Sequence, residues 1–146
     1  TVYPGMAAWL MDSGESIAPT GDLAPQQQVA ESNYELRNGI FQHPPQTGTS
    51  QYSWLITLPE TDSAHFDTAI AMKTGSGMSD GVTFRILING QEVFSQAKAG
   101  AGGYEDVSID LSDYRGQTII LTLCVDSGAG SAYDYAFWGD PLIYTR

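Results

Sequence analysis

Residues 79–96 read SDGVTFRILINGQEVFSQ, and this stretch decides the fold class of the 146-residue chain. Across residues 82–88, apolar side chains alternate with the others, which is typical of a β-strand with one buried face. Asn89-Gly90 follows, a pair that favours the positive φ angles of a two-residue type I′ turn. The stretch therefore predicts a β-hairpin whose return strand begins at Val93.

Other stretches are also predicted to be strands, some by the same alternation, and loops, several of them glycine-rich, separate them. They cover residues 8–11, 29–42, 52–58, 66–74, 107–111, 117–125 and 134–144. No segment has the sustained 3.6-residue period of an amphipathic helix. Short strands at this spacing predict an all-β fold, an antiparallel two-sheet β-sandwich (jelly roll) with eight or nine strands.

Three stretches carry finer predictions. Residues 29–42 hold one or two strands, with Asn38-Gly39 as a candidate turn. Residues 117–125, QTIILTLCV, are apolar on both faces, which predicts a central strand covered on both sides. Residues 12–28 lack any period and are rich in Gly, Pro, Ser and Gln, so we expect a functional surface loop or a junction there.

Length and charge limit the architecture and the partners. The chain suits one domain, residues 1–146, which we expect to be monomeric. Seventeen acidic against six basic residues give a net charge of −11, which argues against binding to nucleic acid or to a membrane surface. The single cysteine, Cys124, lies in an apolar run and predicts a buried, inert thiol. The chain begins at Thr1 without a signal-like stretch, so it resembles a piece of a longer protein.

The sequence carries no catalytic signature. Its two histidines, His43 and His65, come without the G-x-S-x-G elbow of a serine hydrolase or the H-E-x-x-H spacing of a metalloprotease. Two carboxylates suffice for glycoside hydrolysis, but seventeen acids make a chance pair easy, so that signal has no specificity. We therefore expect that the chain is not an enzyme.

The eight tyrosines and three tryptophans point instead to carbohydrate. Sugars stack their C–H faces on aromatic rings while their hydroxyls bind polar groups. Tyr104, Tyr133 and Tyr135 follow glycine-rich loops and could share one edge of the sandwich; alternatively, they pack against the fold. Tyr52, Trp54 and Trp138 are expected in the core.

The polar face of the central strands is a second candidate surface. Arg85 is one of only six basic residues, and an extended glycan could lie in a groove along this face. Its other members would be Thr83, Asp106, Ser108, Asp110 and Lys73. The alternative, which we favour, is an ordinary solvated face on which Arg85 pairs with a neighbouring acid.

Calcium is the metal that this composition favours, because glycine loops offer carbonyl oxygens beside carboxylates. If the first and last strands are neighbours, Glu31 approaches Asp134 or Asp140 near one edge. The alternative is that these acidic side chains only cap turns.

Four segments in this order resemble a known family: IFQHPP at 40–45, SDGVTFRILINGQEVF at 79–94, VSIDLSDYRGQTIILTLCVD at 107–126 and DYAFWGDPLI at 134–143. They look like the galactose-binding-like jelly rolls, in particular the carbohydrate-binding modules of the NPCBM type. The D-x-A-x-W positions of that type match Asp134, Ala136 and Trp138. The first 28 residues match nothing in it.

The resemblance implies a secreted, extracellular bacterial module that is appended to a glycoside hydrolase or a similar enzyme and often carries a structural calcium. It also implies that His43 ends a strand leading to the edge where ligand loops gather. The sequence thus predicts a non-catalytic module that binds a polysaccharide or oligosaccharide through His43, Arg85, Tyr104, Tyr133 and Tyr135. The alternatives are a structural or adhesion domain without sugar binding and a small polysaccharide lyase or hydrolase.

Overall fold

The protein is described by a computed structural model that covers residues 5–19 and 21–146. Within these residues there are eleven β-strands and two short 3₁₀ helices. The strands are β1 (Met6–Leu10), β2 (Ser16–Ile17), β3 (Gln26–Ser32), β4 (Glu35–Phe41), β5 (Thr49–Thr57), β6 (Ala64–Met72), β7 (Val82–Ile88), β8 (Gln91–Lys98), β9 (Glu105–Asp110), β10 (Thr118–Asp126) and β11 (Ala136–Thr145). The 3₁₀ helices are η1 (Gly21–Leu23) and η2 (Ser112–Tyr114).

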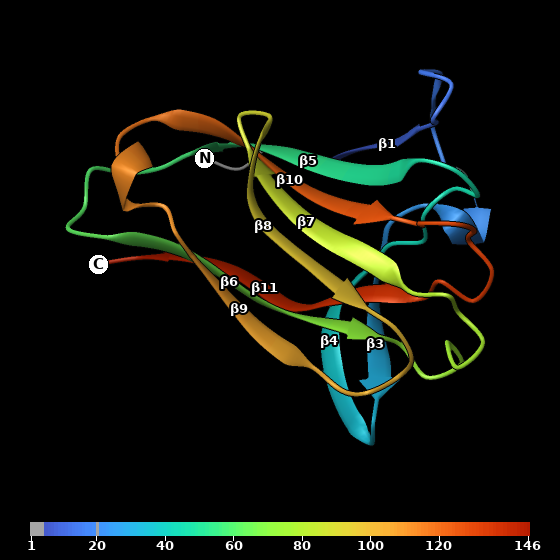
Figure 1. Ribbon diagram of the computed structural model, residues 1–146. Helices are drawn as coiled ribbons and strands as arrows, with labels where there is room; N and C mark the ends of the chain where they lie inside the picture. The colour runs from blue at the N-terminus through green and yellow to red at the C-terminus, as the bar shows by residue number, and fades with distance from the viewer. Residues whose placement is uncertain (1–4, 20) are drawn as a thin grey trace.

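The strands form two antiparallel sheets that pack face to face (Figure 1). Sheet A has the order β2-β1-β5-β10-β7-β8, and sheet B has the order β3-β4-β11-β6-β9. The predicted all-β jelly-roll sandwich is confirmed. The expected eight or nine strands were too few, because β2, η1 and the start of β3 lie within residues 12–28, which looked structureless.

The hairpin at 79–96 is β7 and β8, as predicted. Asn89 and Gly90 have φ angles of 51° and 82°, the left-handed pair that a type I′ turn requires. Asn89 also holds the neighbouring strand, because its Oδ1 accepts a hydrogen bond from the Ile120 amide at 2.9 Å. The return strand begins at Gln91 rather than Val93, since Gln91 pairs directly with Ile88 across the turn.

The candidate turn at Asn38-Gly39 was wrong. Both residues lie inside β4, and the chain turns instead at Asn33-Tyr34, with φ angles of 50° and 69°. Gly39 has a different purpose: a Cβ atom there would collide with the carbonyl oxygen of Trp138. The glycine thus allows β4 and β11 to approach each other.

Alternating side chains of both sheets form the main core. Trp138 on β11 is fully buried and meets the ring of Phe84 on β7 edge-on, with centroids 5.0 Å apart. A smaller cluster covers the outer face of sheet B, where Phe137 packs against Phe41 and Ala30. Trp138 is therefore core as predicted, and Trp54 packs against the core while remaining partly exposed.

Strand β10 lies between β5 and β7, so the prediction of a central strand is confirmed. Its coverage on both faces is confirmed only in part. The outward side chain of Ile120 is 47% exposed, whereas Thr122 on the same face is buried. Cys124 faces the same side and is also buried, as expected for an inert thiol, and burial raises its pKa.

Candidate functional site

Three loops meet at one end of the sandwich, on the right in Figure 1: residues 42–48, 73–81 and 127–135. Backbone hydrogen bonds join the segments there. The Lys73 amide donates to the Tyr135 carbonyl at 2.8 Å, and the Gln42 amide donates to the Ala136 carbonyl at 2.9 Å. We call this region the loop end.

An aromatic cluster lies at the loop end. The rings of Phe41, His43 and Tyr135 form a triangle with centroid separations of 6.1 to 6.3 Å. Tyr133 stands edge-on to Tyr135 at 6.2 Å and is 43% exposed, with a left-handed φ of 59°. The structure therefore brings together three of the predicted sugar-binding residues: His43, Tyr133 and Tyr135.

Polar side chains line a pocket of about 290 Å³ beside this cluster. The Lys73 ammonium lies 5.4 Å from the centre of the Phe41 ring and donates to Oε1 of Gln28 at 3.3 Å. Gln26, Thr74 and Tyr135 complete the lining. The pocket thus combines an aromatic wall with amide, hydroxyl and ammonium groups, the chemistry that sugar recognition needs.

His43 is held in a defined state. Burial lowers the pKa of His43, although its hydrogen bond to the Pro44 carbonyl acts the other way. Nδ1 lies 2.8 Å from that carbonyl, so Nδ1 carries the proton of the neutral ring and Nε2 is an acceptor. Trp9 of β1 donates from its indole nitrogen to the His43 carbonyl at 3.1 Å and fixes the backbone there.

Tyr104 does not join this group. It lies on the outer face of sheet B, where its hydroxyl donates to the Ala30 carbonyl at 2.8 Å and its ring meets Phe137 edge-on. The Arg37 guanidinium covers the ring at 4.9 Å. Burial raises the pKa of the Tyr104 hydroxyl. Of the two roles considered for Tyr104, the structure favours packing.

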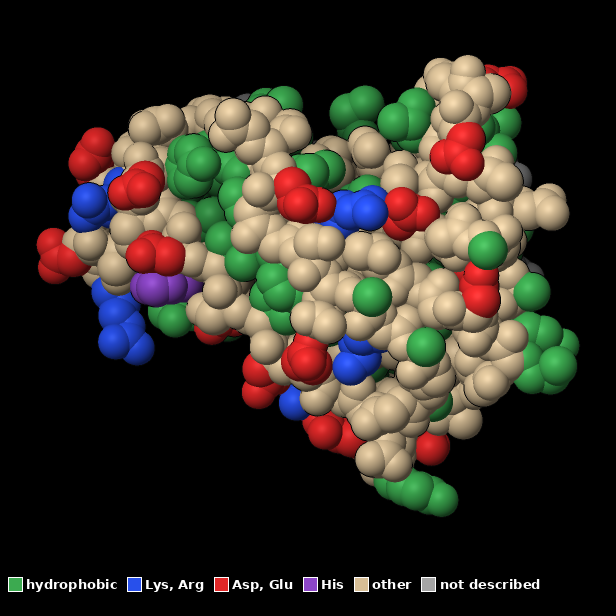
Figure 2. All heavy atoms as spheres, in the orientation of Figure 1, with side chains coloured by type: hydrophobic (Ala, Val, Ile, Leu, Met, Phe, Trp, Pro, Cys, Tyr) green, Lys and Arg blue, Asp and Glu red, His purple; other side chains and the backbone are tan. Residues whose placement is uncertain are grey.

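Arg85 is paired, as the favoured alternative predicted. Its guanidinium lies 2.9 Å from Asp126 and 3.1 Å from Glu92, and the hydrogen bond that it donates to Asp126 raises the Arg85 pKa. The residues predicted to line a groove around Arg85 do not share one face. Thr83 and Arg85 belong to sheet A, whereas Asp106, Ser108 and Asp110 lie on β9 of sheet B. On the side seen in Figure 2, acidic side chains are spread out rather than gathered in one patch.

The three predicted calcium ligands are divided. Glu31 and Asp134 both flank the 73–81 loop: Thr74 donates its amide to the Glu31 carbonyl at 2.7 Å, and Ser79 donates its hydroxyl to Asp134. Asp140 lies within β11, six residues after Asp134 in the chain, beside Arg37 at 3.8 Å. Among the described residues, no three His, Cys, Asp or Glu side chains form a metal-binding group.

Asp134 is the most unusual of these groups. It is fully buried, and its Oδ2 has no hydrogen-bond partner; the hydroxyl of Ser76, in the adjoining loop, is also buried and unpartnered. Burial is the main cause that raises the pKa of Asp134 to about 6, and the nearby Asp80 adds to it. A cation would satisfy the orphaned Oδ2 of Asp134, so this carboxylate fits part of an oxygen-ligand site.

We expect Asp134→Asn to flatten the pH dependence of stability in EDTA. Between its unfolded pKa near 4 and its folded pKa of about 6, Asp134 keeps a proton in the folded state that the unfolded chain loses. The free energy of unfolding of the unmodified protein therefore falls as pH rises through this window, by about 2–3 kcal/mol. Urea unfolding from pH 4 to 7 measures the difference; an equal fall in the variant would contradict the assignment.

Comparisons with known proteins place the fold. No family model matches the chain, and no curated protein matches it. Solved structures do match, and they define the class of fold: the galactose-binding-like jelly roll of carbohydrate-binding modules. The fold that the resemblance implied is thereby confirmed.

Three of the similar structures are particular modules. One contains the two CBM51 domains and the M60 catalytic domain of ZmpB from Clostridium perfringens, with a TM-score of 0.63 and 18% identity over 87% of this chain and 14% of that one. The tandem CBM51 modules of a Streptococcus pneumoniae family 98 glycoside hydrolase match with a TM-score of 0.63 and 16% identity. That match covers 97% of this chain and 48% of the other. The CBM51 of Clostridium perfringens GH95, in complex with methyl-galactose, matches with a TM-score of 0.57 and 15% identity. That match covers 97% of this chain and 90% of the other.

Proposed function

We propose that the chain is a non-catalytic carbohydrate-binding module that binds a sugar at the loop end. The observation that carries the proposal is the pocket in which Tyr135 and Phe41 adjoin Lys73 and Gln28, with His43 and Tyr133 beside it. The jelly-roll fold, shared with carbohydrate-binding modules, supports the same function.

In this proposal, Tyr133 and Tyr135 provide rings on which a sugar face stacks. The free Nε2 of neutral His43 accepts a hydrogen bond from one hydroxyl, and the Lys73 ammonium donates to another. Because the pocket is small and polar, little binding energy remains after desolvation, so we expect weak affinity. Longer glycans gain affinity only where further residues of the sugar touch the surface.

The proposal also covers the kind of protein to which this module belongs. Two of the similar structures join CBM51 modules to a catalytic domain or come from a glycoside hydrolase. We infer that this chain is likewise part of a secreted, extracellular bacterial protein that also contains an enzyme domain. The module would keep that enzyme bound to its polysaccharide substrate. Among the described residues, no helix is long and apolar enough to cross a membrane.

Sugar binding is tested by glycan array and by affinity gels, with a reducing-sugar assay for product. We expect retention without product, and a loss of about fivefold in affinity in each of Tyr133→Ala and Tyr135→Ala, because an aromatic contact contributes about 1 kcal/mol per ring. Tyr144→Ala is the matched control, since Tyr144 also has a histidine ring beside it, His65, but at the opposite end of β11.

The outcomes separate the alternatives. No retention on any glycan would favour a structural or adhesion domain, and release of product would favour a lyase or hydrolase. Retention that survives both loop-end variants but is lost in Arg85→Ala would move the site to sheet A.

We also propose a structural calcium ion at the 73–81 loop, held by Asp134 and Glu31 with the hydroxyl of Ser76. The support is the buried, unpartnered Oδ2 of Asp134. When bound, the ion would supply fixed positive charge that neutralises this carboxylate. It would also hold the loop that carries Lys73, which lines the sugar pocket.

Calcium is expected to raise the melting temperature of the EDTA-treated protein by several degrees, because a ligand that binds only the folded state stabilises it. Asp134→Asn should abolish the rise. Asp140→Asn is the matched control and should retain it, since Asp140 lies beside Arg37 within β11. An unchanged melting temperature in the unmodified protein, or a full response in Asp134→Asn, would contradict this site.

A further inference from the structure

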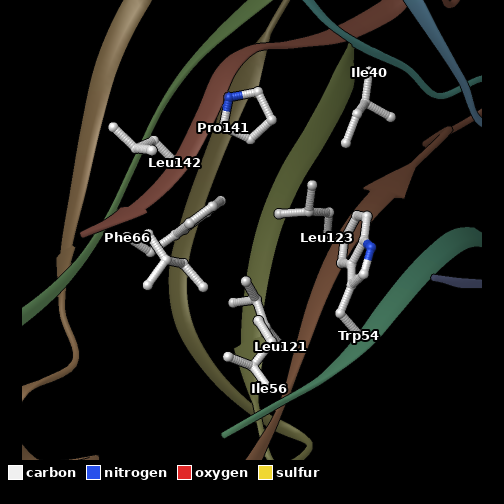
Figure 3. A pocket seen from close by; sticks show the side chains of 9 residues that line it. Ile40, Trp54, Ile56, Phe66, Leu121, Leu123, Pro141 and Leu142 are labelled. Carbon is white, nitrogen blue, oxygen red and sulfur yellow. The ribbon is translucent and has the colours of Figure 1, made fainter. Parts of the chain in front are cut away.

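A second cleft opens between the two sheets, away from the loop end. Its deep part has a volume of about 360 Å³ and its mouth about 410 Å³, and the two share Ile40, Trp54 and Pro141. Figure 3 shows the deep part, with Trp54 and Leu121 of sheet A on one side and Ile40, Pro141 and Leu142 of sheet B on the other. It is continuous with solvent through the mouth.

The opening follows from the path of β11. Strand β11 pairs with β4 only as far as Gly139, and its pairing with β6 shifts register between Gly139 and Leu142. Asp140 has a left-handed φ of 46°, and Pro141 has no amide to donate. The strand therefore leaves β4 here, and Leu142 stays 57% exposed at the rim.

The two parts of the cleft differ in chemistry. The deep part is lined by hydrocarbon and aromatic side chains, among which only the Trp54 indole N–H can bind a hydroxyl, so burying a hydroxylated group there is unfavourable. The mouth carries Gln27, Asn38 and Asp140 beside the ring of Tyr52, which stacks on Trp54 at 4.2 Å. Among the described residues that line the mouth, Asp140 alone is charged, and the whole chain carries a net charge of −11, so an anionic headgroup is disfavoured.

We propose that this cleft binds an amphipathic molecule whose alkyl chain fills the deep part and whose neutral, hydroxylated headgroup lies at the mouth. Alkyl glycosides are the simplest members of this class. The site is independent of the loop-end pocket, with which it shares no lining residue. Its ligand is selected by the alkyl chain, whereas a sugar at the loop end is selected by its hydroxyls.

The test titrates butyl, hexyl and octyl β-glucoside, below their micelle concentrations, into the full chain and follows tryptophan fluorescence. Affinity should rise with chain length, up to about fourfold per methylene group. Methyl β-glucoside, which has no chain to bury, should bind this cleft far more weakly. The series is repeated in Tyr135→Ala, which removes the loop-end contribution, and the chain-length dependence should be unchanged there.

Leu142→Asp should reduce octyl glucoside affinity at least tenfold, because it places a carboxylate at the rim of the hydrocarbon part. Leu55→Asp is the matched control and should bind normally, since Leu55 is a 42% exposed leucine that faces the outer side of sheet A. Ile40→Trp fills the junction of the two parts of the cleft, so it should also reduce octyl glucoside affinity. Melting curves confirm that each variant is folded.

Three results would overturn the proposal: affinity that does not depend on chain length, unchanged binding in both Leu142→Asp and Ile40→Trp, or binding that appears only after deletion of residues 1–4. The last result would mean that the chain itself fills the cleft. Failure of sugar retention in the loop-end variants leaves this proposal untouched, because Leu142→Asp and Ile40→Trp alter the cleft and not the loop-end pocket.

Discussion

Replacing Gln42 by leucine is expected to lower the free energy of unfolding by about 3–5 kcal/mol. Gln42 is fully buried at the end of β4 and joins the two sheets. Its Nε2 donates to the carbonyls of Ser50 and Leu123 in sheet A, at 2.9 and 3.1 Å. Its Oε1 accepts from the Trp138 indole in sheet B at 2.9 Å.

Leucine fills nearly the same space but removes four buried hydrogen-bond contacts: those to the Ser50 carbonyl, the Ser50 hydroxyl, the Leu123 carbonyl and the Trp138 indole. Each costs about 1–3 kcal/mol, and the additional apolar contact offsets part of the sum. Urea denaturation gives the midpoint and slope. Gln51→Leu is the matched control on the neighbouring β5, where a partly exposed glutamine binds only Thr49, and a change within about 0.5 kcal/mol is expected. A loss below about 1 kcal/mol in Gln42→Leu would show that the bridge is dispensable.

Gly39→Ala is expected to destabilise the protein by about 3 kcal/mol. The added Cβ would collide with the Trp138 carbonyl oxygen and lie 2.9 Å from Cε1 of Phe137. Neither obstacle can turn away, because one belongs to the backbone of β11 and the other to a buried ring. Strands β4 and β11 must therefore separate, although they share only three residue pairs.

Gly102→Ala is the control for this change, since a Cβ atom there would meet nothing within 4 Å. Thermal unfolding of the two variants should differ by about 10 °C or more, at the usual few degrees per kcal/mol. Similar melting temperatures would mean that β11 can shift away from β4 without cost.

Much of the fold could be predicted because alternation and turn chemistry are local properties. The β7–β8 hairpin needed only its own eighteen residues, and the antiparallel sandwich followed from many such segments. The errors arose where distant pairing decides. Asn38-Gly39 has the composition of a turn, but its glycine is required by the approach of Trp138, nearly one hundred residues later. Likewise, Ile120 lies on an apolar strand whose outer face is left partly open.

The residues of the candidate site also fall into those that the local sequence predicts and those that depend on distant strand pairing. His43, Tyr133 and Tyr135 could be proposed from the sequence because they adjoin loops that meet at one end of a sandwich. Lys73 was placed on the wrong surface, and Gln26, Gln28 and Phe41 were missed, since only the pairing of β3 and β4 beside β11 brings them to the pocket. The polar run Gln26-Gln27-Gln28 could have indicated a polar site here, because such a run inside a strand exposes amides on both faces of the sheet.

The direction of β11 has a practical consequence. The strand starts at the loop end and runs to the opposite pole, where Arg146 and Ser63 exchange backbone hydrogen bonds and the chain leaves the sandwich (Figure 1). A tether attached after Arg146 therefore holds the molecule with its aromatic pocket facing outward. Immobilised on a sensor chip or a bead in this orientation, every copy presents the pocket to the solution.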